Sequence, residues 1–252
     1  MEEYYQINAD GCAVRCKLYA DEGSCIERLV LFGHGFGGHK DNRAAKAFAK
    51  RILKKNSGIA TVTFNWPCHG DDGGKTIRLE ECDRYLRVLL ADIRERFGSP
   101  ELYGYGNSFG AYLFLKFMSE HGDPFGKTAL RSPAVNMYEV ICSAIMTGKD
   151  RDRICAGETV QAGFDRKIEI DGAFLDSLQK ADIVQRDFRP FADSMLILHG
   201  TEDEIVPFEA SKGFAEKNGI RFIPVEGGDH RFLGPGNMDF AVAKMLEHFG
   251  FE

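Results

Sequence analysis

The chain has 252 residues, of which 44% are hydrophobic and 28% charged, a profile typical of an ordinary globular protein. Its 32 Lys and Arg residues against 38 Asp and Glu give a formal net charge of −6, and no long basic run is present. We therefore expect no nucleic-acid partner. The seven cysteines are scattered without C-x-x-C pairs, which argues against a zinc ribbon or a redox motif.

The N-terminal residues are acidic and lack the apolar run of a signal peptide. No apolar stretch approaches the roughly 20 residues needed to cross a bilayer. These features predict a cytoplasmic protein without a membrane partner. A homodimer remains possible on sequence grounds.

An N-A-D-G turn signal at residues 8–11 separates β-prone runs at 4–7 and 12–19, which predicts an antiparallel hairpin at the start of the chain. Further short apolar runs without clean alternation are typical of strands buried on both faces. They span 28–32, 60–64, 101–105, 128–131, 195–199 and 221–225. Helical patterns lie between them at 43–55, 79–97, 109–121, 208–218 and 238–249.

Strands and helices alternate through most of the chain, which predicts an α/β fold with a mostly parallel, eight-stranded sheet and helices on both faces. The alternation breaks between residues 133 and 189, where charge and glycine are more frequent. We interpret 133–189 as a small inserted cap over the carboxyl ends of the strands. The core would then be formed by 1–132 and 190–252.

Gly106-Asn107-Ser108-Phe109-Gly110 follows one predicted strand and opens the next helix. A serine in a G-x-S-x-G sequence at a tight strand-to-helix turn is typical of an exposed nucleophile. The flanking glycines allow close backbone packing at the turn. The sequence therefore predicts Ser108 as a nucleophile.

A serine nucleophile needs a histidine base and an orienting carboxylate, in the chain order serine, acid, histidine for this architecture. Of the downstream histidines, His230 lies in a loop after the last strand, whereas His199 and His248 lie in predicted elements. We therefore favour His230 as the base. Asp203 is the favoured acid within H-G-T-E-D-E-I-V-P, where its two glutamate neighbours compete, and Asp229 is expected to form a turn.

The loop after the third strand, G-H-G-F-G-G-H-K-D at residues 33–41, is rich in glycine. Glycines let a backbone approach an acyl oxygen and turn an N–H toward it. Phe36 is expected to supply one such oxyanion donor, and Phe109, at the start of the helix after Ser108, the other. His34 and His69 are expected to brace loops.

The motifs H-G-F-G-G-H-K-D, F-N-W-P-C-H-G-D, G-N-S-F-G, H-G-T-E-D-E-I-V-P and G-G-D-H resemble those of the α/β-hydrolase fold family. The arrangement is similar to the serine aminopeptidase-like and cinnamoyl (feruloyl) esterase-like branch, and the resemblance covers nearly the whole chain except the cap. It implies an α/β-hydrolase fold with Ser108, Asp203 and His230 as a triad and the backbone N–H groups of Phe36 and Phe109 as an oxyanion hole. Trp66-Pro67-Cys68 departs from the family pattern and leaves the pocket rim undefined.

These expectations describe a serine hydrolase that cleaves a small carboxylic ester with a short-chain or aromatic acyl group and uses no cofactor and no metal. A thioesterase, an aminopeptidase or acylpeptide hydrolase, or a catalytically silent binding protein of the same fold are the alternatives. The cap aromatics Tyr138, Phe164 and Phe174 are candidates for substrate contact.

Overall fold

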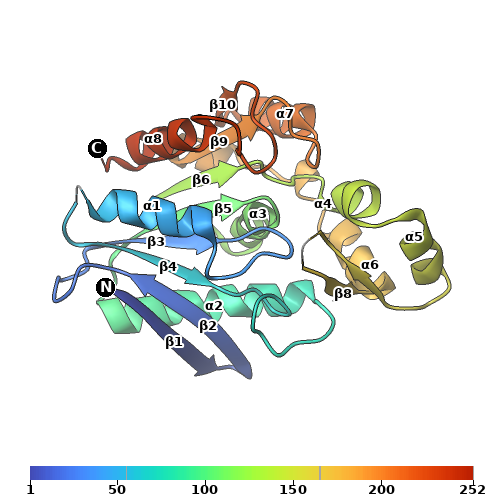
Figure 1. Cartoon of the computed structure of the whole chain (residues 1–252), viewed down its shortest axis with the longest axis horizontal. Coiled ribbons are helices and arrows are strands. Elements are labelled where there is room, and N and C mark those ends of the chain that lie inside the picture. The colour runs from blue at the N-terminus through green and yellow to red at the C-terminus, as the bar shows by residue number, and fades with distance from the viewer. Residues whose placement is uncertain (55, 165, 252) are drawn as a thin grey trace.

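The computed structural model describes residues 1–54, 56–164 and 166–251, and its centre is a single eight-stranded sheet (Figure 1). The strand order is β1-β2-β4-β3-β5-β6-β9-β10, and β1 and β2 are antiparallel to their neighbours while the other pairings are parallel. The strands are β1 (Glu2–Ala9), β2 (Cys12–Tyr19), β3 (Arg28–Gly33), β4 (Ile59–Phe64), β5 (Glu101–Asn107), β6 (Lys127–Arg131), β9 (Met195–Gly200) and β10 (Arg221–Val225). The predicted hairpin and eight-stranded, mostly parallel sheet are confirmed.

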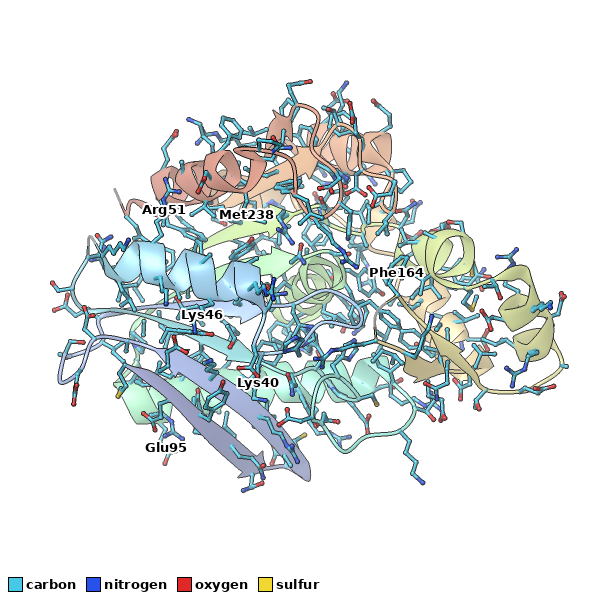
Figure 2. All side chains as sticks on the ribbon, in the orientation of Figure 1. Lys40, Lys46, Arg51, Glu95, Phe164 and Met238 are labelled. Atoms are coloured by element: carbon cyan, nitrogen blue, oxygen red, sulfur yellow. The ribbon has the colours of Figure 1, made fainter. Side chains whose placement is uncertain are left out.

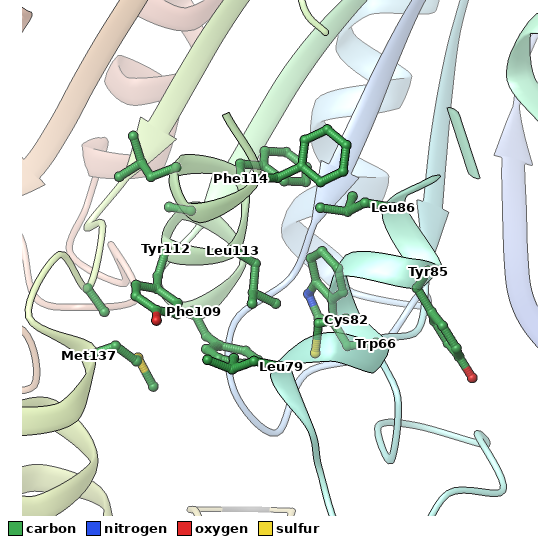
Figure 3. Packing of buried hydrophobic residues seen from close by; sticks show 14 of the residues in the cluster. Trp66, Leu79, Cys82, Tyr85, Leu86, Phe109, Tyr112, Leu113, Phe114 and Met137 are labelled. Atoms are coloured by element: carbon green, nitrogen blue, oxygen red, sulfur yellow. The ribbon is translucent and has the colours of Figure 1, made fainter. Parts of the chain in front are cut away.

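In the part of the chain that the structure describes, five long helices cover the two faces of the sheet. They are α1 (Arg43–Leu53), α2 (Leu79–Phe97), α3 (Phe109–His121), α7 (Phe208–Asn218) and α8 (Asn237–Phe249). Side chains of α1 and α8 share one buried cluster with alternate residues of β3, β5 and β9, and side chains of α2, α3 and α7 share another. Figure 3 shows the second cluster where α3 packs against α2, with Trp66, Leu113 and Phe114 among the labelled side chains. Burial on both faces explains why the central strands carry apolar runs instead of alternating patterns.

Helix boundaries agree closely with the sequence patterns. Helix α1 begins after Asn42, whose side chain accepts hydrogen bonds from the N–H groups of Ala44 and Ala45 and so caps the first turn. It ends at Leu53, and the predicted end at Lys55 lies outside the described residues. Helix α2 ends at Phe97, and the next residue, Gly98, adopts the left-handed conformation that commonly ends a helix.

The segment between β6 and β9 forms a separate small layer beyond the carboxyl ends of the central strands (Figure 1). We call it the cap segment. Its elements are α4 (Met137–Val140), η1 (Ile141–Ile145), α5 (Gly148–Cys155), the antiparallel pair β7 (Val160–Ala162) and β8 (Ile168–Ile170), α6 (Gly172–Lys180), η2 (Ile183–Gln185) and η3 (Arg189–Ser194). Arg78 donates two hydrogen bonds to the Asp171 carboxylate, at 3.0 and 2.6 Å, and this pair ties the cap segment to the start of α2.

Among residues 1–54, 56–164 and 166–251, no helix combines the length and the apolarity needed to cross a bilayer.

Candidate active site

Ser108 lies on the tight turn between β5 and α3 and has a φ of +52°, which a non-glycine residue rarely adopts. The surrounding glycines are required by packing. A Cβ on Gly106 would lie 2.7 Å from the Cα of Ala111, and a Cβ on Gly110 would lie 2.3 Å from the carbonyl oxygen of Gly33. Both contacts are shorter than real Cβ atoms show. The G-x-S-x-G sequence therefore folds into the sharp turn that its glycines predicted.

Asp203 and His230 follow the neighbouring strands β9 and β10, and the structure brings their side chains together. A Cβ on Gly200 would lie only 2.1 Å from the carbonyl oxygen of Gly228, so the two loops pack backbone against backbone. The Nδ1 atom of His230 lies 2.8 Å from Oδ2 and 3.1 Å from Oδ1 of Asp203. Nδ1 therefore holds the proton in the neutral ring, which leaves the lone pair on Nε2.

The Asp203 carboxylate is buried and receives hydrogen bonds from several sides. Its Oδ1 accepts from the backbone N–H groups of Ile205 and Val206, at 2.9 and 2.8 Å, and the Nε2 atom of His199 lies 3.1 Å from Oδ2. Burial by itself raises the pKa of Asp203, but the hydrogen bonds from His199 and His230 outweigh burial and lower the pKa well below its usual range. Asp203 is therefore an anion at any physiological pH.

Three other acid and histidine side chains near the site have partners of their own. The carboxylate of Glu204 accepts a hydrogen bond from the backbone N–H of His230, at 3.2 Å. Asp229 accepts from the N–H of Leu233 at 2.8 Å, as expected of a turn residue. His248 is buried, with Nε2 3.1 Å from the carbonyl oxygen of Ser194. None of these three side chains takes the place of Asp203 or His230.

The glycine-rich loop after β3 lies directly against Ser108. A Cβ on Gly35 would be 3.3 Å from the Cβ of Ser108, and the N–H of Gly38 donates to the carbonyl oxygen of Gly35 at 2.9 Å. The Phe36 ring in this turn meets the Phe109 ring edge to face, with centroids 5.5 Å apart. Phe109 opens α3, so its N–H has no acceptor within the helix. The main chains of Phe36 and Phe109 thus approach the turn that holds Ser108.

Two buried histidines brace this loop, His34 within it and His69 packed against it. His34 Nε2 accepts from the backbone N–H of Trp66 at 3.3 Å, and the Trp66 indole donates to the His34 carbonyl oxygen at 2.9 Å. The Nδ1 atom of His69 lies 2.9 Å from the Pro67 carbonyl oxygen. Burial lowers the pKa of His34 and lowers that of His69 to about 4, so both rings are neutral near pH 7. Both histidines hold the loops together, as their positions predicted.

A cavity of about 890 Å³ opens beside Ser108 and is lined by Ser108, His230, Phe36 and, from the cap segment, Phe164. Figure 2 labels Phe164 at the side of the cap segment that faces the sheet. The other two cap aromatics lie elsewhere. Tyr138 lines a second, much smaller cavity, and Phe174 is fully buried in the core. The structure therefore brings Phe164, but neither Tyr138 nor Phe174, to the cavity beside Ser108.

Comparison with known proteins agrees with this architecture. Residues 24–156, more than half of the chain, match the family model described as serine aminopeptidase, S33. The chain belongs to the serine aminopeptidase S33 family. Its fold is therefore the α/β-hydrolase fold and its class is that of the serine hydrolases, as the motifs implied.

Solved structures show how widely this fold is shared. Est1E from Butyrivibrio proteoclasticus, in a structure with ferulic acid bound, is 20% identical with a TM-score of 0.79, and the match covers 98% of this chain and 99% of that one. A putative hydrolase from Agrobacterium vitis S4 is 14% identical with a TM-score of 0.74 over 98% of both chains. The esterase domain of a Rhodothermus marinus protein is 16% identical with a TM-score of 0.70, covering 100% of this chain and 98% of that one.

In this S33 family member the structure also brings to the site two residues that the sequence analysis did not assign to it. His199 contacts the carboxylate of Asp203, and Arg131, at the end of β6, lines the cavity. The signal for Arg131 was a charged residue at the end of the apolar run T-A-L-R. No signal in the sequence pointed to the contact of His199, because its partner follows in an irregular loop.

Proposed function

We propose that this protein is a carboxylic ester hydrolase that forms an acyl-enzyme on Ser108, with His230 as general base and Asp203 as the orienting acid. The observation that carries the proposal is the 2.8 Å hydrogen bond between Asp203 and His230 Nδ1 at a cavity that His230 shares with Ser108. Since the proton resides on Nδ1, Nε2 is the ring atom that can accept the serine proton.

In the first half-reaction Ser108 Oγ attacks the carbonyl carbon of the ester while His230 Nε2 takes the hydroxyl proton. The imidazolium that forms is stabilised by the Asp203 carboxylate, which stays ionised because its pKa is lowered. The imidazolium then gives its proton to the alkoxide leaving group as the tetrahedral intermediate collapses. In the second half-reaction His230 activates a water, which attacks the acyl-enzyme and releases the acid product and free Ser108.

The negative charge of each tetrahedral intermediate needs fixed donors. We assign this role to the backbone N–H groups of Phe36 and Phe109. Gly35 lies against Ser108, and Phe109 presents the free N–H of a helix start. Loss of one such donor typically lowers the rate about 10²–10³-fold.

Charge in the cavity favours an ester over the peptide of an aminopeptidase. An aminopeptidase must bind a cationic α-amine, and a carboxylate is the usual partner of such a group. Among the described residues of the cavity lining, the only carboxylate is Asp239, and Arg51 already pairs with it at 3.0 Å. Arg131 lies in the same lining. A substrate without a positive charge therefore suits this cavity better.

The test of the proposal is the Ser108→Ala variant, assayed with 4-nitrophenyl acetate and with a fluorophosphonate probe. We expect turnover to fall by at least about 10³-fold and labelling to be lost, because alanine lacks the hydroxyl on which the acyl-enzyme forms. Ser143→Ala, at an exposed serine of the cap segment, is the matched control and is expected to behave as the natural protein. Undiminished turnover or labelling of Ser108→Ala would remove Ser108 from the mechanism.

A panel of substrates separates the ester hydrolase from its alternatives. 4-Nitrophenyl esters of rising chain length, hydroxycinnamate methyl esters, acyl-CoA thioesters and aminoacyl nitroanilides are compared by kcat/KM. We expect the oxygen esters to give the highest kcat/KM. A preference for the nitroanilides would assign the site to an aminopeptidase instead.

A further inference from the structure

Arg131 is a buried cation beside the proposed nucleophile, and the described part of the chain supplies no carboxylate for it. Only 4% of the residue is exposed, and no Asp or Glu oxygen among the described residues lies within 4.0 Å of its guanidinium. An arginine side chain keeps its charge at any accessible pH, and a buried charge without a counter-ion is strongly unfavourable. An anion in the adjoining cavity would supply the missing charge.

The contacts of Arg131 leave part of its guanidinium available. Nε donates to Oδ1 of Asn107 at 2.8 Å, and Nη1 lies 3.6 Å from the sulfur of Met238. The guanidinium carbon lies 5.3 Å above the Phe232 ring. Of the five N–H donors of an arginine, three thus have no acceptor among the described residues. Because Arg131, Met238 and Phe232 all line the cavity, these donors adjoin a space that a ligand can enter.

Arg131 is also close to the reacting serine. It pairs with Asn107 in the parallel register of β5 and β6, so its backbone is one strand spacing, about 4.8 Å, from the residue that precedes Ser108. The carbonyl oxygen of Arg131 accepts the N–H of Ser108 at 2.9 Å. An anion held by this guanidinium would therefore belong to the same small molecule as the scissile ester, a few bonds away from it.

Other positive groups surround the same cavity. Arg43, at the start of α1, and Arg166, in the cap segment, line it from two further directions. The first turn of α8 lines it as well, and its N-cap, Gly236, makes no side-chain hydrogen bond to that turn. The carboxylate of this turn, Asp239, pairs with Arg51 at 3.0 Å. Figure 2 labels two lining residues, Met238 from this first turn and Phe164 from the cap segment. This positive lining contrasts with the formal net charge of −6 of the whole chain.

We propose that the cavity binds an anionic group of the substrate on Arg131, so that the natural ester carries a carboxylate or a phosphate a few bonds from the carbon that Ser108 attacks. This inference rests on the proposed function, since it names the substrate class for that site. The shared chemistry is an oxyanion with two oxygens that match the fork of the guanidinium.

The first test compares two esters of equal length with the natural protein. Mono(4-nitrophenyl) glutarate ends in a carboxylate, and 4-nitrophenyl valerate ends in a methyl group. After subtraction of the uncatalysed rates, kcat/KM is expected to be at least about 10-fold higher for the charged ester, as one charge-assisted hydrogen-bonded pair provides. Equal rates, or a preference for valerate, would overturn the inference.

The second test removes the charge of Arg131. In Arg131→Gln the ratio of kcat/KM for the glutarate ester to kcat/KM for the valerate ester is expected to fall about 10-fold or more. Arg131→Lys keeps the charge but not the fork of the guanidinium, and its ratio is expected to lie between those of the natural protein and Arg131→Gln. Because Arg131 also holds Asn107, both absolute rates fall, and the ratio isolates the effect on the anion. Arg94→Gln, at an exposed arginine of α2, is the matched control and keeps the natural ratio. An unchanged ratio in Arg131→Gln would overturn the inference.

The third test measures binding without turnover, and it holds even if Arg131→Gln does not fold. Calorimetry of Ser108→Ala with glutarate, inorganic phosphate and neutral glutaramide is expected to show heat for an anion and none for glutaramide. Tighter binding of glutarate than of phosphate identifies a substrate with a carboxylate, and tighter binding of phosphate identifies a phosphorylated substrate. Binding of neither anion would overturn the inference while leaving the hydrolase proposal intact. Failure of the Ser108→Ala activity test would remove the hydrolase proposal and with it the assignment of an anionic ester, while the calorimetry would still report whether Arg131 holds an anion.

Discussion

Substitution of Gly110 by alanine is the sharpest test of how the turn around Ser108 is built. The new Cβ would lie 2.3 Å from the carbonyl oxygen of Gly33 and 2.7 Å from that of His34, whereas ordinary contacts begin near 3.4 Å. Both partners are backbone, so α3 and the loop after β3 must separate by roughly 1 Å. Overpacking of this kind costs about 1–3 kcal/mol. The same shift moves Ser108 away from the proposed oxyanion donors, and a displacement of about 1 Å can lower a rate about 10²-fold.

The measurement compares Gly110→Ala with Gly213→Ala, the same change in another helix. A Cβ on Gly213 meets nothing within 4 Å, so alanine is expected to stabilise α7 by about 0.5–1 kcal/mol and to leave turnover unchanged. The free energy of unfolding is followed by urea titration, with the buried Trp66 as the fluorescent probe. Ester hydrolysis gives kcat. If Gly110→Ala matched Gly213→Ala in both stability and kcat, the close packing of the turn would not be what positions Ser108.

Three further predictions follow from the same contacts. Asp203→Asn is expected to lower kcat about 10³–10⁴-fold with little change in KM, because the imidazole loses its anionic partner; a loss below tenfold would contradict this role. The pKa of His69 is lowered to about 4, so below pH 6.5 the unfolded chain binds a proton that the folded chain does not bind; stability is expected to fall by up to about 3 kcal/mol between pH 6.5 and 4, and to fall less steeply in His69→Gln. Arg78→Gln removes a partly exposed ion pair with Asp171 and is expected to cost only about 0.5–1 kcal/mol globally, but to speed amide hydrogen exchange in β8; unchanged exchange would mean that the pair does not hold the cap segment.

The contact between His199 and Asp203 is a feature of the site that the sequence alone did not predict. The ring of His199 is fully buried, and its Nε2 lies 3.1 Å from both the Asp203 carboxylate and the carbonyl oxygen of Val206. His199 and His230 thus contact the same oxygen of Asp203, Oδ2. Burial was foreseen from the position of His199 in β9, but the contact depends on how the following loop turns back.

The sequence by itself determined the order and type of the elements of the core, because periodicity, capping residues and glycine turns act over a few residues. Strands such as β3 and β9 carry runs of four apolar residues, and α2, α3 and α7 have the predicted bounds. The candidate site was predictable for the same reason. Ser108 directly follows β5, and Asp203 and His230 lie in the loops after β9 and β10; parallel strands bring their carboxyl ends to one edge of the sheet.

Only the tertiary structure decided which side chains face the cavity. Tyr138, Phe164 and Phe174 look alike in the sequence of the cap, yet one lines the cavity beside Ser108, one lines a smaller cavity and one is buried in the core. Arg131 acquires its environment from Asn107 in the neighbouring strand and from residues about 100 positions later in the chain. Such contacts depend on the relative placement of distant segments, which no local pattern of residues encodes.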